Sequence, residues 1–166
     1  MAQFALKGNP FNTVGDLPAA GSQAPVFNLV GADLGPVTSE DLAGKKVVLN
    51  VFPSIDTDVC AASVRRFNEE AGKRDNVTVV CVSMDLPFAA GRFCGAEGLE
   101  NVKTASDFRN GQFGKDYGMR IDDGPLAGLL ARSVILLDAS GSVMYTELVP
   151  ETTQEPNYDA VLALLG

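Results

Sequence analysis

The stretch KKVVLNVFPSIDTDVCAASVRRF, residues 45–67, decides the fold class because an apolar run turns into a helical pattern within it. Its first eight residues are β-branched and almost continuously apolar, which is typical of a strand buried on both faces of a sheet. Val64, Phe67 and Ala71 then recur at positions i, i+3 and i+7. This spacing predicts a helix from Val59 to about Lys73 with one stripe facing the core. A buried strand that leads into such a helix indicates an α/β sandwich.

Strands and helices are expected to alternate along the rest of the chain. Three further strands are predicted, at residues 77–83, 132–138 and 143–149. Helical patterns predict a short helix that gives way to a glycine-rich loop within 86–98 and an amphipathic helix over 157–166. The opening predicts a hairpin over 3–15 and a short strand within 24–31. This order favours a single α/β domain, residues 1–166, with a mixed central sheet, and a thioredoxin-like arrangement fits it.

Composition and charge narrow the range of possible binding partners and substrates. The 166 residues are 46% hydrophobic, enough for one domain that buries roughly 70% of its unfolded surface. A formal net charge of −8 argues against nucleic acid or an anionic membrane as partner, since both attract basic surfaces. No apolar run predicts a membrane span, and the N-terminus lacks the pattern of a secretory signal. A cytoplasmic protein with a small or neutral substrate is therefore expected.

The absence of histidine excludes several enzyme classes. Neither a Ser-His-Asp triad nor a Cys-His pair can form. Cys60, Cys81 and Cys94 are 21 and 13 positions apart, so no C-x-x-C motif for zinc or for a redox dithiol is present. Three cysteines are also too few for a disulfide scaffold, which favours a catalytic over a structural pairing among them.

Cys60 falls where the predicted helix begins. If Thr57 or Asp58 caps the helix, the thiol lies in the first turn, where free backbone N–H groups and the positive end of the helix dipole stabilise a thiolate. Val64 and Phe67 follow four and seven residues later, so the sulfur is expected to be recessed on the core-facing stripe. A small apolar residue that fills a helix–strand junction explains the same position equally well.

Two segments carry a family resemblance. NVFPSIDTDVCAASVRRFN (50–68) and VSMDLPFAAGRFCGAEGLENV (82–102) closely resemble the bacterial thiol peroxidases, the atypical two-cysteine branch of the peroxiredoxins. The resemblance extends over nearly the whole chain, including DGPLAGLLARSVILLD (123–138) and YTELVPETTQEPNYDAVLALL (145–165). The peroxiredoxin pattern Pro-x-x-x-Thr-x-x-Cys falls on Pro53, Thr57 and Cys60, and Phe93-Cys94-Gly95 follows at the family's distance.

The resemblance implies a role for each matching residue. It makes Cys60 the peroxidatic cysteine and Cys94 the resolving cysteine of the same chain. It makes Thr57 the hydroxyl that hydrogen-bonds the thiolate and the peroxide, Pro53 a shield against water, and Arg132 a guanidinium from a neighbouring strand. Without the resemblance, Arg132 is better explained as a charge guarding the entrance of an apolar strand, and Cys94 equally well as a packed thiol. A cation buried there requires an anionic partner, which the Cys60 thiolate can supply.

The resulting hypothesis is a peroxidase cycle that requires no metal, haem or flavin. The Cys60 thiolate attacks the peroxide bond and becomes a sulfenic acid, Cys94 condenses with it to a disulfide, and an external dithiol reduces that disulfide. Gly91, Gly95 and Gly98 weaken the helix around Cys94, which suits a segment that must unwind. Cys81, inside a buried strand, is expected to be inert.

The family also implies thioredoxin as the reductant, a homodimer, and alkyl or lipid hydroperoxides as substrates besides hydrogen peroxide. Two alternatives stay open. A protein dithiol-disulfide oxidoreductase is disfavoured by the missing C-x-x-C motif, and a non-enzymatic redox sensor would oxidise Cys60 without cycling. Asp58 departs from the family pattern, in which a small neutral residue or proline is usual. Its carboxylate repels a nearby thiolate unless it points into solvent.

Overall fold

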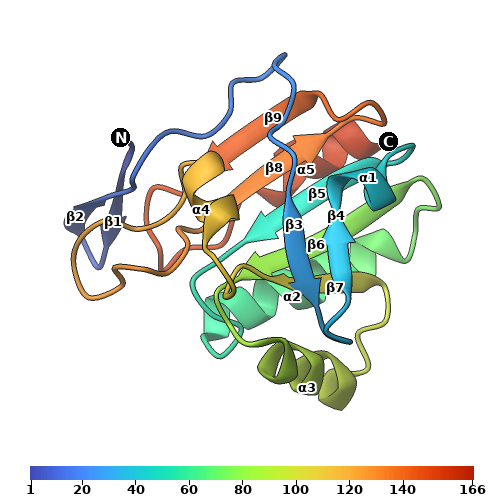
Figure 1. The fold of residues 1–166 in the computed structure, drawn as a ribbon, viewed down its shortest axis with the longest axis horizontal. Helices are drawn as coiled ribbons and strands as arrows, with labels where there is room; N and C mark the ends of the chain where they lie inside the picture. Colours follow the sequence, from blue (N-terminus) through green and yellow to red (C-terminus); the bar gives the residue numbers. More distant parts are fainter.

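The computed structural model describes residues 1–166 and is built on a seven-stranded mixed sheet with the order β4-β3-β7-β6-β5-β8-β9 (Figure 1). Its strands are β3 (Asn28–Gly31), β4 (Pro36–Thr38), β5 (Lys46–Val51), β6 (Val77–Ser83), β7 (Val102–Ser106), β8 (Ser133–Leu137) and β9 (Val143–Leu148). The three central strands β5, β6 and β7 are parallel, and the outer strands pair antiparallel. A separate hairpin precedes the sheet, with β1 (Gln3–Leu6) paired to β2 (Asn9–Asn12). The predicted mixed sheet and N-terminal hairpin are confirmed.

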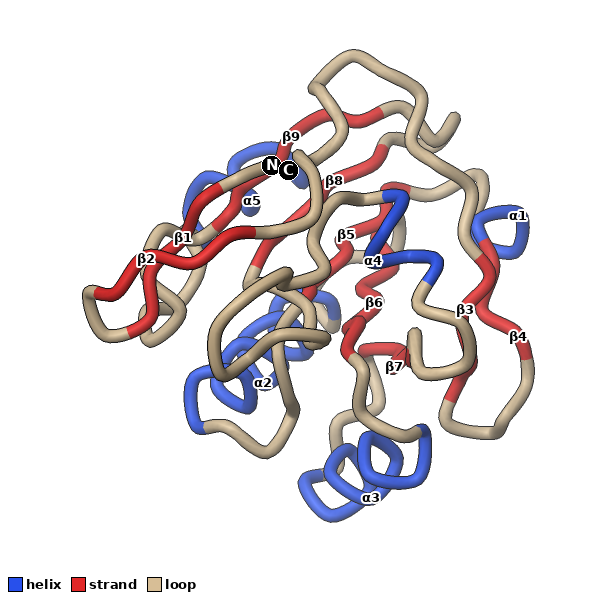
Figure 2. The backbone as a smooth tube through the Cα atoms, turned by 60° about the vertical axis from the view of Figure 1, so that its left-hand side comes forward, coloured by secondary structure: helices blue, strands red, loops and turns tan.

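Helices cover both faces of this sheet (Figure 2). They are α1 (Ser39–Leu42), α2 (Asp58–Ala71), α3 (Pro87–Glu97), α4 (Gln112–Asp116) and α5 (Tyr158–Leu165). Side chains of α2 and α5 pack on one face of the central strands, and those of α4 pack on the other. Val47 and Leu49 of β5 point to the α4 side, while Val48 between them points to the α2 side. The almost continuous apolar run of β5 therefore reflects burial on both faces.

The region after β6 differs from the prediction. Instead of giving way to a loop, α3 continues through Gly91 and Gly95 and ends at Gly98, whose φ of 66° forms a left-handed C-cap. Four short elements, β4, α1, β7 and α4, were not predicted at all. None exceeds five residues, and Lys103 interrupts the apolar pattern of β7. None of the helices combines the length and the apolarity that crossing a membrane requires.

Candidate active site

Cys60 lies in the first turn of α2, as predicted. The helix begins at Asp58 with Thr57 as the N-cap residue, so Cys60 occupies the third helical position. Its side chain is 0% exposed and packs in the same core cluster as Val64 and Phe67. Thr57 makes no side-chain cap, so this residue does not supply an acceptor for the free amides of the first turn. Those amides favour an anion at the helix start.

The loop before α2 holds the other two residues of the Pro-x-x-x-Thr-x-x-Cys pattern. Pro53 is buried two residues after the end of β5, and Thr57 is exposed. The Thr57 hydroxyl donates a hydrogen bond to the carbonyl oxygen of Ser54, at 3.1 Å. This bond turns the hydroxyl back towards the loop and leaves its oxygen lone pairs available as acceptors.

Arg132 lies at the same edge of the sheet as the start of α2. It directly precedes β8, and β8 pairs antiparallel with β5 so that Ser133 is opposite Val51, the last residue of β5. The Arg132 side chain is only 3% exposed, and its Nε donates to the carbonyl oxygen of Thr152 at 2.9 Å. Its Nη1 has no hydrogen-bond partner.

No carboxylate neutralises the Arg132 guanidinium. Every ion pair within 4.0 Å in the structure involves another cationic group. A buried cation without an acidic partner is costly, because burial removes the water that stabilises its charge. The open Nη1 donor and the uncompensated charge together make this position receptive to an anion.

No pattern in the sequence points to Thr152. Its backbone N–H donates to the carbonyl oxygen of Ala5, and the N–H of Ala5 donates to that of Pro150, both at 2.8 Å. Glu151 accepts a further bond from the N–H of Gly8 at 2.8 Å. The N-terminal hairpin is thus fastened to the segment whose carbonyl holds Arg132.

Cys94 and Cys60 are on different helices but contact the same core. Cys94 of α3 is half-buried, packs against the core cluster that contains Cys60, and lines a surface pocket of 370 Å³. Burial raises the pKa of the Cys94 thiol, and the charge of Glu97 raises it further. All three cysteines are free thiols, so the structure contains no disulfide.

Cys81 of β6 is closed off from solvent. Its side chain is 2% exposed, and its Sγ accepts a weak hydrogen bond from Asn50 Nδ2 at 3.8 Å. Burial raises the pKa of the Cys81 thiol to about 12. A thiol of this kind is protonated and unreactive at neutral pH.

An ion pair joins the two cysteine-bearing helices. Arg65 of α2 forms two parallel hydrogen bonds with the carboxylate of Glu97 on α3, each 2.6 Å long. The same guanidinium lies over the ring of Phe93, 5.6 Å from its centroid. The α3 helix is thus held against α2 on both sides of Cys94 in the sequence.

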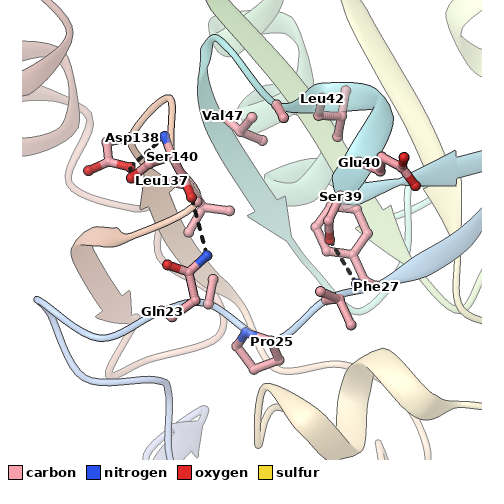
Figure 3. Close-up of a pocket in the computed structure, with 14 residues that line it drawn as sticks. Gln23, Pro25, Phe27, Ser39, Glu40, Leu42, Val47, Leu137, Asp138 and Ser140 are labelled. Carbon is pink, nitrogen blue, oxygen red and sulfur yellow. Dashed lines mark hydrogen bonds between the residues drawn. The ribbon is translucent and has the colours of Figure 1, made fainter.

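One further pocket lies far from the start of α2, and the side chains form no metal site. The pocket drawn in Figure 3 has a volume of 210 Å³ and is lined by Phe27, Leu42, Val47 and Leu137 among others. Val47 and Leu137 are paired at the end of the sheet opposite to the start of α2. No group of three or more His, Cys, Asp or Glu side chains is placed to hold a metal ion.

Fold and site together define a class of protein: a thioredoxin-like α/β sandwich with the peroxiredoxin cysteine pattern where its central strand leads into α2. A family model described as Redoxin matches residues 19–162. Thiol peroxidases of Mycobacterium tuberculosis and Corynebacterium glutamicum are 61% and 55% identical over 166 residues, covering 100% of this chain and 99% and 100% of theirs. The crystal structure of a peroxiredoxin-like protein from Aquifex aeolicus superposes with a TM-score of 0.94 at 41% identity, covering 99% of this chain and 96% of that one. The chain belongs to the Redoxin family and, within it, to the thiol peroxidases.

Proposed function

We propose that this thiol-dependent peroxidase reduces hydroperoxides through Cys60, with Cys94 as the resolving cysteine of the same chain. The observation that carries the proposal is the buried Arg132, which has an open Nη1 donor and no acidic partner at the edge of the sheet where α2 begins. A thiolate on Cys60, in the first turn of α2, supplies the negative charge that compensates the Arg132 guanidinium.

The first step transfers oxygen to sulfur. The Cys60 thiolate attacks one peroxide oxygen, the O–O bond breaks, and the departing oxygen takes the electron pair and a proton to become an alcohol or water. Arg132 stabilises the negative charge as it moves from sulfur to oxygen, and the Thr57 hydroxyl does so once its proton turns from the Ser54 carbonyl towards the reacting atoms. Pro53 limits the access of water to the sulfur. Since Cys60 is completely buried, the peroxide reaches the sulfur only when a local movement opens a path to it.

The second step forms the disulfide. The Cys94 sulfur attacks the sulfenic acid of Cys60, an S–S bond forms, and the hydroxyl leaves as water. Cys94 lies in the second half of α3, so this helix unwinds to bring the two sulfurs together. An external dithiol then reduces the disulfide by thiol exchange and is itself oxidised.

Several finer points belong to the same proposal. Thioredoxin is the external dithiol, the substrates include alkyl or lipid hydroperoxides besides hydrogen peroxide, and the protein acts in the cytoplasm as one domain of residues 1–166. A homodimer is supported by Leu86, Phe88 and Phe108, large apolar side chains that are 52%, 67% and 36% exposed. Exposed apolar groups of this kind favour contact with another protein surface.

The assignment of the cysteines is tested by mass spectrometry after one equivalent of hydroperoxide. We expect a Cys60–Cys94 bond within the monomer in the wild type and in a Cys81→Ser control. A Cys94→Ser variant is expected to stop at a sulfenic acid on Cys60 that dimedone traps. A Cys60–Cys81 bond, or a bond between chains, would contradict the role of Cys94.

Turnover separates the peroxidase from a redox sensor. With thioredoxin, its reductase and NADPH present, we expect hydroperoxide-dependent consumption of NADPH over many cycles. Consumption of one equivalent alone would indicate a sensor instead.

A further inference from the structure

Asp85 joins the two segments that carry the proposed redox cysteines. It lies in the loop between β6 and α3, and its carboxylate accepts three hydrogen bonds. Oδ1 accepts from the Ser54 hydroxyl at 2.8 Å, and Oδ2 accepts from the backbone N–H of Ile55 at 2.7 Å and from the Ser83 hydroxyl at 2.8 Å. Two of these donors belong to the loop that leads into α2. One carboxylate therefore fixes the segment that directly precedes the Cys60 helix.

Ser54 passes this constraint on to Thr57. The Ser54 carbonyl oxygen accepts from the Thr57 N–H at 3.2 Å and from the Thr57 hydroxyl at 3.1 Å. Asp85 holds Ser54 by its side chain, and Ser54 holds Thr57 by its backbone. Removing the Asp85 carboxylate therefore loosens the part of the loop that orients the Thr57 hydroxyl.

We propose that Asp85 is a positioning residue for the peroxidase reaction: its carboxylate fixes the loop of residues 54–57 and so places the Thr57 hydroxyl for the reaction at Cys60. The inference rests on the function proposed above for Cys60 and Thr57. Asp85 acts through Ser54 and Ile55 and does not itself take part in the chemistry.

The same residue is anchored on its other side. The Asp85 backbone carbonyl accepts a hydrogen bond from the Ser106 hydroxyl at the end of β7. The start of α3 is thus tied to the ends of two central strands. When α3 unwinds to release Cys94, the movement begins beyond Asp85, and the loop before Cys60 keeps its place.

Whether neutralising Asp85 makes the oxidation of Cys60 faster or slower distinguishes a positioning role from a purely electrostatic one. A carboxylate close to an anionic sulfur disfavours the thiolate, so charge alone predicts faster oxidation when Asp85 is neutralised. Loss of positioning predicts slower oxidation. Asp56 provides a matched control, because it lies exposed in the same loop and its carboxylate has only a 4.0 Å contact with Arg92.

The test compares Asp85→Asn with Asp56→Asn in two reactions of the full-length reduced protein. The asparagine keeps the shape of Asp85 but turns an N–H₂ donor towards other donors. We expect oxidation of Cys60 by hydroperoxide to slow about 100-fold in Asp85→Asn, the effect of a displacement near 1 Å. Alkylation of Cys60 by iodoacetamide needs no hydroxyl from Thr57, and we expect it to change far less. Asp56→Asn is expected to keep the wild-type ratio of the two rates.

Ser54→Ala gives a second, independent measurement. It removes one donor to Asp85 and is expected to slow oxidation less than Asp85→Asn does. The double variant is expected to be no slower than Asp85→Asn, because both changes break the same contact.

Each other outcome overturns the inference in a recognisable way. Wild-type oxidation by Asp85→Asn would refute it and leave the roles of Cys60 and Cys94 intact. An equal loss in oxidation and alkylation would show that Asp85 only maintains the fold. Oxidation of the wild type at a cysteine other than Cys60 would refute both the proposed function and this inference.

Discussion

Replacing the two glycines inside α3 by alanine is predicted to slow disulfide formation without slowing peroxide reduction. Gly91 and Gly95 are both helical, and the structure has room for a methyl group at each. A Cβ on Gly95 has no neighbour within 4 Å, and one on Gly91 meets only the Ala32 methyl group at 3.5 Å, an ordinary contact. Alanine is therefore accommodated without strain.

The magnitude follows from helix propensity. Each glycine-to-alanine change stabilises a helix interior by about 1 kcal/mol. If α3 must unwind before Cys94 can reach Cys60, the unwound population falls about fivefold for one change and about 30-fold for both. The rate of disulfide formation should fall by the same factors, while the rate of sulfenic acid formation at Cys60 stays at the wild-type value.

The assay is rapid mixing with hydroperoxide, followed by acid quench and mass spectrometry of the sulfenic acid and disulfide forms. Gly98→Ala is the control of opposite sign, because its φ of 66° strains any residue with a side chain and loosens the end of α3. Hydrogen exchange of α3 amides verifies that the helix has been stabilised. Wild-type disulfide rates in a demonstrably stabilised helix would refute the unwinding step.

Three further predictions concern single groups. Arg132→Lys keeps the charge but loses the planar fork that reaches the Thr152 carbonyl, so stopped-flow rates of oxidation should fall roughly tenfold to 100-fold, the effect of one hydrogen bond to a charged group. Cys81, whose pKa is raised to about 12, should resist iodoacetamide at pH 8 until the protein is unfolded, which mass spectrometry of the labelled chain checks. Hydrogen bonds from the N–H groups of Thr153 and Gly8 lower the pKa of Glu151 from 4.5 to about 2, so its contribution to stability is complete above pH 4.5 and is lost as the pH falls through 2. Acid unfolding of wild type and Glu151→Gln should therefore converge in that range, and a constant difference between them would contradict the assignment.

The parts of the fold that the sequence predicts well are those with a continuous or periodic apolar pattern. The strands β5, β6, β8 and β9 and the helix α2 agree with their predicted bounds to within about two residues, because continuous or periodic apolarity leaves few alternatives. The strand β7 was missed because Lys103 is exposed and its neighbours are only partly buried. The sequence underestimates the length of α3, because its glycines indicate a weak helix while the contacts of Arg65 with Glu97 and Phe93, which stabilise it, come from another helix.

The candidate site likewise contains residues whose positions the sequence predicts and residues whose positions it does not. The place of Cys60 in the first turn followed from local pattern, since strand, loop and helix are consecutive. Asp85 was missed, although the carboxyl ends of the parallel strands β5 and β6 meet at one edge and should have indicated that their loops touch. No feature of the sequence identifies Thr152, because it binds Arg132 through its backbone carbonyl, which every residue possesses.

The way Arg132 is held has a consequence for newly synthesised chains. Thr152 follows Cys60 by 92 residues, and its own backbone is fixed by Ala5, 147 residues before it. Translation delivers Cys60 well before Thr152, and the contact between Ala5 and Thr152 joins segments that are far apart in the sequence. A growing polypeptide can therefore expose the cysteine long before its guanidinium is in place. On the function proposed here, peroxide chemistry switches on only after the segment around Thr152 has been made and packed, and chains truncated before Thr152 carry the thiol and a guanidinium that nothing holds in place.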